Sequence, residues 1–269
     1  MRPRRPPRQH RPPRRDGPDR GERTRGERPH PAEDLIRIGG LPSVQALFKR
    51  SPERVERLFF LPERRREAEA FCAVLGRARK PYREVGSDEL AKVAGTVLHG
   101  GIVALARPRP VLDFDPGTVS VPLLLVLDGV SNPHNFGAIV RTLAFFGLDR
   151  LVVSGHPAQA GPSAAAHRVA EGGLEFVEVY RATNLPAALK RLRPRYRVVG
   201  TALGKSGGLS SLPQDKPIAL VLGNEEQGLD PATLAVCDQV LTLAGSGAVQ
   251  SLNVAATAAI LIHALKAKS

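Results

Sequence analysis

Short apolar segments recur through the second half of this 269-residue chain, and each predicts a β-strand buried on both faces. The expected strands are 123–127, 150–153, 176–179, 197–201, 218–222 and 240–243. Helical patterns lie between most of them, and residues 251–268 predict a closing helix. This alternation predicts an α/β fold whose parallel sheet is covered by helices on both sides. Ligands of such sheets bind beyond the carboxyl ends of the strands, so a binding site is expected in those loops.

Residues 34–108 predict a separate and smaller α/β unit. Val44, Leu47 and Phe48 are spaced to share one helix face, and apolar patterns predict a strand in 54–61, a helix in 67–77 and a strand in 101–108. Prolines, a glycine and acidic residues then fill 109–120, which predicts a linker. The sheet domain accordingly begins near residue 121.

Basic residues dominate the charge of the chain, with 39 Lys and Arg against 26 Asp and Glu. Residues 1–30 hold 11 arginines against four acidic residues, and residues 1–32 contain almost nothing apolar. This segment predicts a disordered Arg/Pro-rich tail, because it cannot bury enough surface to offset its ordering entropy. Excess positive charge indicates a polyanionic partner, most often nucleic acid, although a merely solubilising tail is an equal alternative.

Cys72 and Cys237 stand alone in the sequence, which indicates neither a disulfide framework nor a metal site. No apolar run approaches the roughly 18 residues of a membrane helix, and the N-terminus lacks the apolar region of a secretory signal. We therefore expect a cytoplasmic protein without a metal and without a membrane partner.

The first polar loop, SNPHNFGAIVRT at residues 131–142, follows the strand expected at 123–127. Asn135 could be the N-cap of the next helix. That interpretation leaves Asn132, His134 and Arg141 unexplained. Arg141 stands among apolar neighbours, and a buried arginine needs a carboxylate or phosphate partner.

Two further loops follow the strands expected at 218–222 and 240–243. In LGNEEQGLDP, the glycines are explained by a turn and Asp230 by a helix cap. Glu225 is not explained in this way, and it could hold Arg141 or bind ligand hydroxyls. In LAGSGAVQSLN, Ser251 could be a helix cap, yet Asn253 would then occupy a first helical turn, where asparagine is a mediocre choice. A GKS tripeptide at 204–206 lacks the spacing of a phosphate-binding loop, because only three residues separate Gly200 from Gly204.

Taken together and in this order, the three loops resemble the motifs of the SpoU, or TrmH, family of RNA ribose 2′-O-methyltransferases in the SPOUT class. The resemblance implies a SPOUT-type α/β trefoil-knot domain with a parallel sheet over 121–269, working as a homodimer. It assigns Arg141, Asn135, Glu225, Ser251 and Asn253 to catalysis, with Glu225 fixing Arg141 and His134 structural.

The same resemblance implies S-adenosylmethionine as the cofactor, with contacts at Gly223, Leu243 and Leu252 and a looser candidate at Thr201. Ala244 stands where the family usually has proline, which affects cofactor affinity. Residues 34–108 are similar to the L30e-like RNA substrate-binding domain of some members. RNA contacts at Arg37 and Lys49 are possible there, although each could be an ordinary solvated charge.

The resemblance implies methyl transfer to RNA, with ribosomal RNA favoured over transfer RNA as the substrate. A non-catalytic RNA-binding protein of the same fold, acting in ribosome assembly, is the second hypothesis. A nucleotide hydrolase that uses Lys205 is the third.

Overall fold

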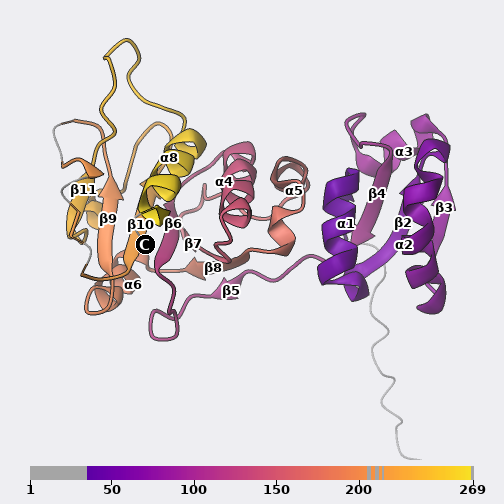
Figure 1. Ribbon diagram of the computed structural model, residues 1–269, viewed down its shortest axis with the longest axis horizontal. Coiled ribbons are helices and arrows are strands. Elements are labelled where there is room, and N and C mark those ends of the chain that lie inside the picture. Colours follow the sequence, from indigo (N-terminus) through magenta and orange to yellow (C-terminus); the bar gives the residue numbers. More distant parts are fainter. Residues whose placement is uncertain (1–34, 205–206, 210–211, 214, 268–269) are drawn as a thin grey trace, which may run out of the picture. The chain divides into compact units, whose positions relative to one another are not determined.

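A computed structural model of the protein describes residues 35–204, 207–209, 212–213 and 215–267 (Figure 1). The predicted tail at 1–32 and the Lys205 and Ser206 of the GKS tripeptide lie outside these residues. None of the described helices is long and apolar enough to cross a membrane.

A four-stranded sheet forms the first part of the described chain, with the strand order β1-β4-β2-β3. Its strands are β1 (Ile36–Gly39), β2 (Val55–Phe60), β3 (Tyr82–Glu84) and β4 (Ile102–Ala106). Strand β4 runs antiparallel to β1 and β2, whereas β2 and β3 are parallel. The helices are α1 (Leu41–Arg50), α2 (Arg65–Arg77) and α3 (Ser87–Ala94), with 3-10 turns η1 (Pro52–Arg54) and η2 (Pro62–Arg64). Val44 and Leu47 are fully buried, as their spacing predicts, while Phe48 is partly buried.

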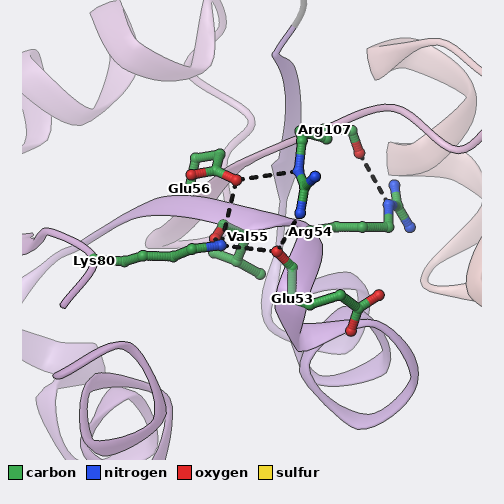
Figure 2. A network of polar contacts seen from close by, with 6 residues as sticks. All are labelled: Glu53, Arg54, Val55, Glu56, Lys80 and Arg107. Atoms are coloured by element: carbon green, nitrogen blue, oxygen red, sulfur yellow. Dashed lines mark hydrogen bonds and ion pairs between the residues drawn. The ribbon is translucent and has the colours of Figure 1, made fainter. Parts of the chain in front are cut away.

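A polar network closes one end of this small sheet (Figure 2). The Lys80 ammonium donates to the carbonyl oxygens of Glu53 (2.7 Å) and Val55 (2.6 Å). Arg107 forms an ion pair with Glu56 at 3.1 Å, and its own carbonyl accepts from Nε of Arg54 at 2.9 Å. These bonds join η1 and β2 to the chain that leaves β4, and they fix the base of the Arg54 guanidinium.

The second sheet has seven parallel strands in the order β11-β9-β10-β6-β7-β8-β5 among the described residues (Figure 1). The strands are β5 (Leu112–Asp113), β6 (Leu123–Asp128), β7 (Arg150–Ser154), β8 (Glu178–Ala182), β9 (Arg197–Thr201), β10 (Ile218–Gly223) and β11 (Gln239–Leu241). The helices are α4 (Pro133–Phe145), α5 (Ala164–Ala170), α6 (Leu185–Leu192), α7 (Pro231–Leu234) and α8 (Val254–Lys266), with the 3-10 turn η3 (Gly173–Glu175). The predicted parallel α/β architecture is confirmed.

Alternate residues of the central strand β6 enter two different apolar cores. Leu123, Leu125 and Leu127 pack with α4, α5 and α8, whereas Leu124 and Val126 pack with α6. Helices therefore cover both faces, which is why the strand is apolar up to its last residue, Asp128. Helix α4 lies so close to α5 that a Cβ at Gly137 would stand 2.6 Å from the Ala166 carbonyl oxygen.

The strands differ from the sequence predictions at three places. The strand predicted at 176–179 begins only at Glu178, because the turn η3 engages the backbone N–H groups of Phe176 and Val177 through Gly173. The last strand, predicted at 240–243, ends at Leu241. The predicted linker contains β5, which pairs with β8. The domain boundaries proposed at 108–121 stay a prediction.

Helix α1 of the small unit packs against α5 and η3 through a group of buried polar side chains. Arg54 Nη1 and Glu175 Oε2 form an ion pair at 2.7 Å, with both side chains almost fully buried. Burial raises the pKa of Glu175 despite that pair. Burial, followed by the positive charges of Arg54 and Arg109, lowers the pKa of His167 on α5 to about 4.

We predict that His167 makes the free energy of unfolding fall as the pH is lowered. Its folded pKa of about 4 lies below the ordinary value of 6.5, so between these pH values the unfolded chain binds the extra proton. The full effect is about 3 kcal/mol. Urea unfolding of the wild type and of His167→Leu between pH 7 and 4 measures the difference in slope.

The exposed His134 provides the control variant His134→Leu. Glu175 contributes the opposite slope in every variant, because its folded pKa is raised, so the difference between variants isolates His167. Equal slopes for the wild type and His167→Leu would contradict the prediction.

Candidate functional site

The three polar loops lie together at the carboxyl ends of the central strands. Strand β6 leads into α4, β10 leads into the turn at 224–228, and β11 leads through residues 242–253 into α8. Because β6 and β10 are neighbours in register, with Asp128 opposite Gly223, the loops after them begin side by side.

The Glu225 carboxylate binds the start of α4. Its Oε2 accepts from the backbone N–H of Ser131 at 3.2 Å, and its Oε1 accepts from the N–H of Asn132 at 3.3 Å and from Nδ2 of Asn135 at 2.8 Å. Burial alone would raise the pKa of Glu225, but these hydrogen bonds hold it below its usual value. The carboxylate is therefore ionised at neutral pH and lies at the positive end of the helix dipole.

Asn135 connects this carboxylate to the last helix. Its Oδ1 accepts from Nδ2 of Asn253 at 2.9 Å, while Oδ1 of Asn253 accepts from the backbone N–H of Ala255 at 2.8 Å. Asn253 is thus the N-cap of α8, and Asn132 is the N-cap of α4. The alternatives that made Asn135 or Ser251 a cap are wrong, whereas Asp230 caps α7 as predicted.

Asn224 is a structural residue of this site that the sequence reasoning missed. Its Nδ2 donates to the carbonyl oxygen of Gly129 at 2.7 Å, and its Oδ1 accepts from the N–H groups of Glu226 and Gln227. It therefore joins the loop after β6 to the turn after β10. The available signal was its position directly after a buried strand, in a turn that begins after Gly223 and ends at Gly228.

A cavity of about 590 Å³ opens beside these loops. All four predicted cofactor residues line it, together with Glu225, Ser251 and Ala244; the four are Thr201, Gly223, Leu243 and Leu252. A Cβ at Gly223 would stand 2.2 Å from the Gly228 carbonyl carbon, so only glycine permits the turn to fold back here. Asn135 and Asn253 do not line the cavity, but Asn135 bonds to Glu225 on its wall and Asn253 bonds to Asn135.

Arg141 lies on α4 away from Glu225. The structure thus contradicts the predictions that Arg141 is buried and that Glu225 holds it. Its guanidinium is half-exposed, and Nη2 forms an ion pair at 2.8 Å with Glu171 rather than with Glu225. The reason is helical geometry, because residues six apart point in directions about 120° apart around the axis. Asn135 faces the loop of Glu225, and Arg141 faces the end of α5.

Glu171, which the sequence reasoning also missed, follows α5 directly and has a left-handed backbone with φ of 44°. A half-exposed ion pair contributes only about 0–1 kcal/mol, so a phosphate group can replace the Glu171 carboxylate at Arg141.

The described residues contain no cluster of His, Cys, Asp and Glu that could hold a metal ion. Arg37 and Lys49, the RNA contacts considered for the small unit, are both exposed.

Comparison with known families matches residues 122–263 to the SpoU rRNA methylase family. Residues 37–112 match the family described as RNA 2′-O ribose methyltransferase substrate binding. The chain belongs to the SpoU rRNA methylase family. The predicted family and enzyme class, an RNA ribose 2′-O-methyltransferase, are thereby confirmed.

Curated relatives of this SpoU protein include 23S rRNA (guanosine-2′-O-)-methyltransferases named RlmB. The Acinetobacter baylyi protein is 36% identical over 240 residues, which cover 83% of this chain and 94% of the relative. The Escherichia coli K12 protein is 33% identical and covers 86% and 98%. An AdoMet-bound rRNA methyltransferase from Sinorhizobium meliloti shares the fold at 20% identity, with a TM-score of 0.73 over 87% of this chain and 88% of that one.

We predict that Asn135→Ala lowers the free energy of unfolding of this SpoU protein by about 1–3 kcal/mol, because Glu225 and Asn253 both lose a partner. Asn135→Asp should be worse at neutral pH, since a second carboxylate would then face Glu225. Thermal unfolding measures both effects, with His134→Ala at the exposed neighbouring position as the control. If Asn135→Asp is as stable as the wild type, the link through Asn135 is not important.

Proposed function

We propose that this protein transfers a methyl group from S-adenosylmethionine to the ribose 2′-hydroxyl of a guanosine in 23S ribosomal RNA, in the cytoplasm. The observation that carries the proposal is the single cavity that joins the predicted cofactor residues to the Glu225–Asn135–Asn253 link. The RlmB relatives support ribosomal over transfer RNA as the substrate.

The cavity suits S-adenosylmethionine in its size and in the chemistry of its walls. Ligand cavities usually measure about 300–1,000 Å³ and are mostly apolar with a few polar groups. Here Leu222, Leu243 and Leu261 provide apolar surface for a purine, and Glu226 and the polar turns are available for the charged amino-acid end. Ala244 replaces the usual proline without removing any hydrogen-bond donor. The change frees the backbone φ of the cofactor loop, so we expect the cofactor to bind with altered affinity.

S-adenosylmethionine supplies an activated methyl group, so the protein has to position the ribose oxygen and stabilise the charge that develops on it. A guanidinium holds its proton too tightly to act as a proton acceptor, which makes Arg141 an electrostatic group that binds the adjacent phosphate and the developing alkoxide. Glu225 is already committed to three N–H donors, and it keeps Asn135 and the start of α4 in place. Ser251, on the cavity wall, is available to the target nucleotide.

A second copy of the chain is proposed to pack on α4 and α8. Both helices expose large apolar side chains, with Phe145 83% and Ile260 44% exposed, and the two helices pack against each other. A homodimer through this face covers both side chains. The family resemblance further supports a trefoil knot formed by the segment that leads into α8.

Methyl transfer provides the direct test of the proposed function. With tritiated S-adenosylmethionine, we expect the wild type to label a 23S ribosomal RNA transcript and not transfer RNA. Arg141→Ala should lower kcat about 100- to 1,000-fold, because a charge-stabilising donor is lost. Arg191→Ala, which removes another exposed and ion-paired arginine, on α6, is the matched control.

Full activity of Arg141→Ala would overturn the role of Arg141. Binding of RNA without methyl transfer and without cofactor binding by calorimetry would instead support the non-catalytic RNA-binding alternative.

The molar mass in solution tests the dimer. We expect the wild type to elute with the mass of two chains in light-scattering chromatography. The double variant Phe145→Glu with Ile260→Glu should elute with the mass of one chain, because a charge on each helix opposes burial of the apolar face. Leu234→Glu, at a partly exposed position on α7, is the control. A double variant that remains dimeric would contradict this interface.

A further inference from the structure

The loop between α3 and β4 presents two adjacent apolar side chains to solvent. Val97 is 78% exposed and Leu98 is 69% exposed, which places them among the most exposed large hydrophobic residues of the described chain. A single exposed aliphatic residue is ordinary in a soluble protein. Two neighbours on a loop of the substrate-binding unit indicate a contact surface.

The loop is held in place by its own hydrogen bonds. The N–H of Leu98 donates to Oγ1 of Thr96 at 3.2 Å, and the N–H of Gly101 donates to Nδ1 of His99 at 3.1 Å. His99 is buried, and its carbonyl oxygen accepts from the N–H of Gly40 at 3.0 Å. Because His99 is fixed in the interior, Val97 and Leu98 are already exposed to solvent before any partner binds.

The close packing of this loop also depends on glycine. Gly100 has a φ of 62°, and a Cβ there would stand 3.0 Å from the Cα of Gly40. The loop therefore rests directly on the turn between β1 and α1. Binding to such a preformed surface loses little conformational entropy.

Two arginines flank the apolar pair. Nε of Arg64 donates to the carbonyl oxygen of Gly100 at 3.3 Å, and the aliphatic part of Arg64 lies against Gly101. Nη1 of Arg37 lies 3.9 Å from the Cβ position of Gly95. Arg37 is exposed and forms no ion pair within the described part of the chain. Arg64 also forms an ion pair with Glu67 at 2.9 Å, and this pair is partly exposed and therefore weak. The apolar pair thus has two arginines near it, of which a phosphate can draw Arg64 away from Glu67.

This combination matches single-stranded RNA. Unpaired bases expose apolar faces that can pack on the aliphatic side chains of Val97 and Leu98, and the phosphates beside them bind arginine. A regular duplex keeps its base faces covered and offers nothing to Val97 and Leu98. An apolar protein partner would use the same two side chains, but the flanking arginines and the net charge of +13 favour a polyanion.

We propose that the loop Gly95–Gly101 binds unpaired nucleotides of the RNA substrate, with a base against Val97 and Leu98 and the adjoining phosphates at Arg37 and Arg64. This inference rests on the proposed function in so far as RNA is the substrate. It adds that the substrate is recognised at an unpaired segment, separate from the methylated ribose.

Fluorescence anisotropy with a labelled RNA stem-loop and a labelled perfect duplex tests the proposal. We expect Val97→Ser with Leu98→Ser to weaken stem-loop binding about tenfold or more, and to leave duplex binding unchanged. Val74→Ser, at a partly exposed position on α2 of the same unit, is the matched control. With 23S ribosomal RNA, the double variant should raise KM and leave kcat and the melting temperature unchanged.

A photoreactive benzophenone side chain placed at position 97 provides a second measurement. Crosslinks to RNA at unpaired nucleotides support the proposal. Unchanged stem-loop affinity of the double variant, or crosslinks only to a second copy of the chain or to another protein, would overturn it. The binding measurements do not need methyl transfer. A wild type without methyltransferase activity would therefore disprove the proposed function, whereas the anisotropy and crosslinking results would still test the loop contact.

Discussion

The contact between the Glu225 carboxylate and the start of α4 is the interaction on which the site depends. Parallel strands bring the loops after β6 and β10 together, but they do not fix the conformation of either loop. Glu225 does so by accepting from two backbone N–H groups and from Asn135, which in turn binds the N-cap of α8. One ionised side chain therefore connects three segments that are far apart in sequence. Because its hydrogen bonds satisfy the charge, the carboxylate is stable in a partly buried position.

The residues that line the cavity and the arginine proposed to stabilise charge come from different parts of the fold. Of the predicted cofactor residues that line the cavity, Thr201 and Gly223 are the last residues of β9 and β10, whereas Leu243 and Leu252 lie in the segment before α8. Arg141 comes from the middle of a helix that is packed closely on α5 through Gly137. A rigid helix fixes the backbone of the arginine, while its long side chain keeps the freedom to reach a phosphate.

The amino-acid sequence was sufficient for the architecture and for part of the site. The apolar run at 123–127 predicts a strand covered on both faces in a parallel sheet, and all six residues of β6 are buried. Polar residues after these strands mark the loops of the site, and the resemblance to the SpoU family then points to Glu225, Asn135 and Asn253 within them. The partner of Arg141 could not be predicted in this way. It depends on the rotation of α4, and Glu171 lies in a left-handed turn that carries no recognisable motif. Similarly, β5 is too short for a periodic pattern, and the turn η3 shifts the start of β8.

In the proposed mechanism, the ion pair between Arg141 and Glu171 keeps an exposed arginine ordered until the substrate binds. A buried pair would hold the guanidinium tightly, because separating it would leave a desolvated charge. A half-exposed pair is weak and is screened by salt, so a dense array of phosphates competes with it effectively. Glu171 thus keeps Arg141 ordered without making its release costly. Under the proposed mechanism, RNA binding and the repositioning of Arg141 are one event, so charge stabilisation is restricted to the complex that contains the substrate.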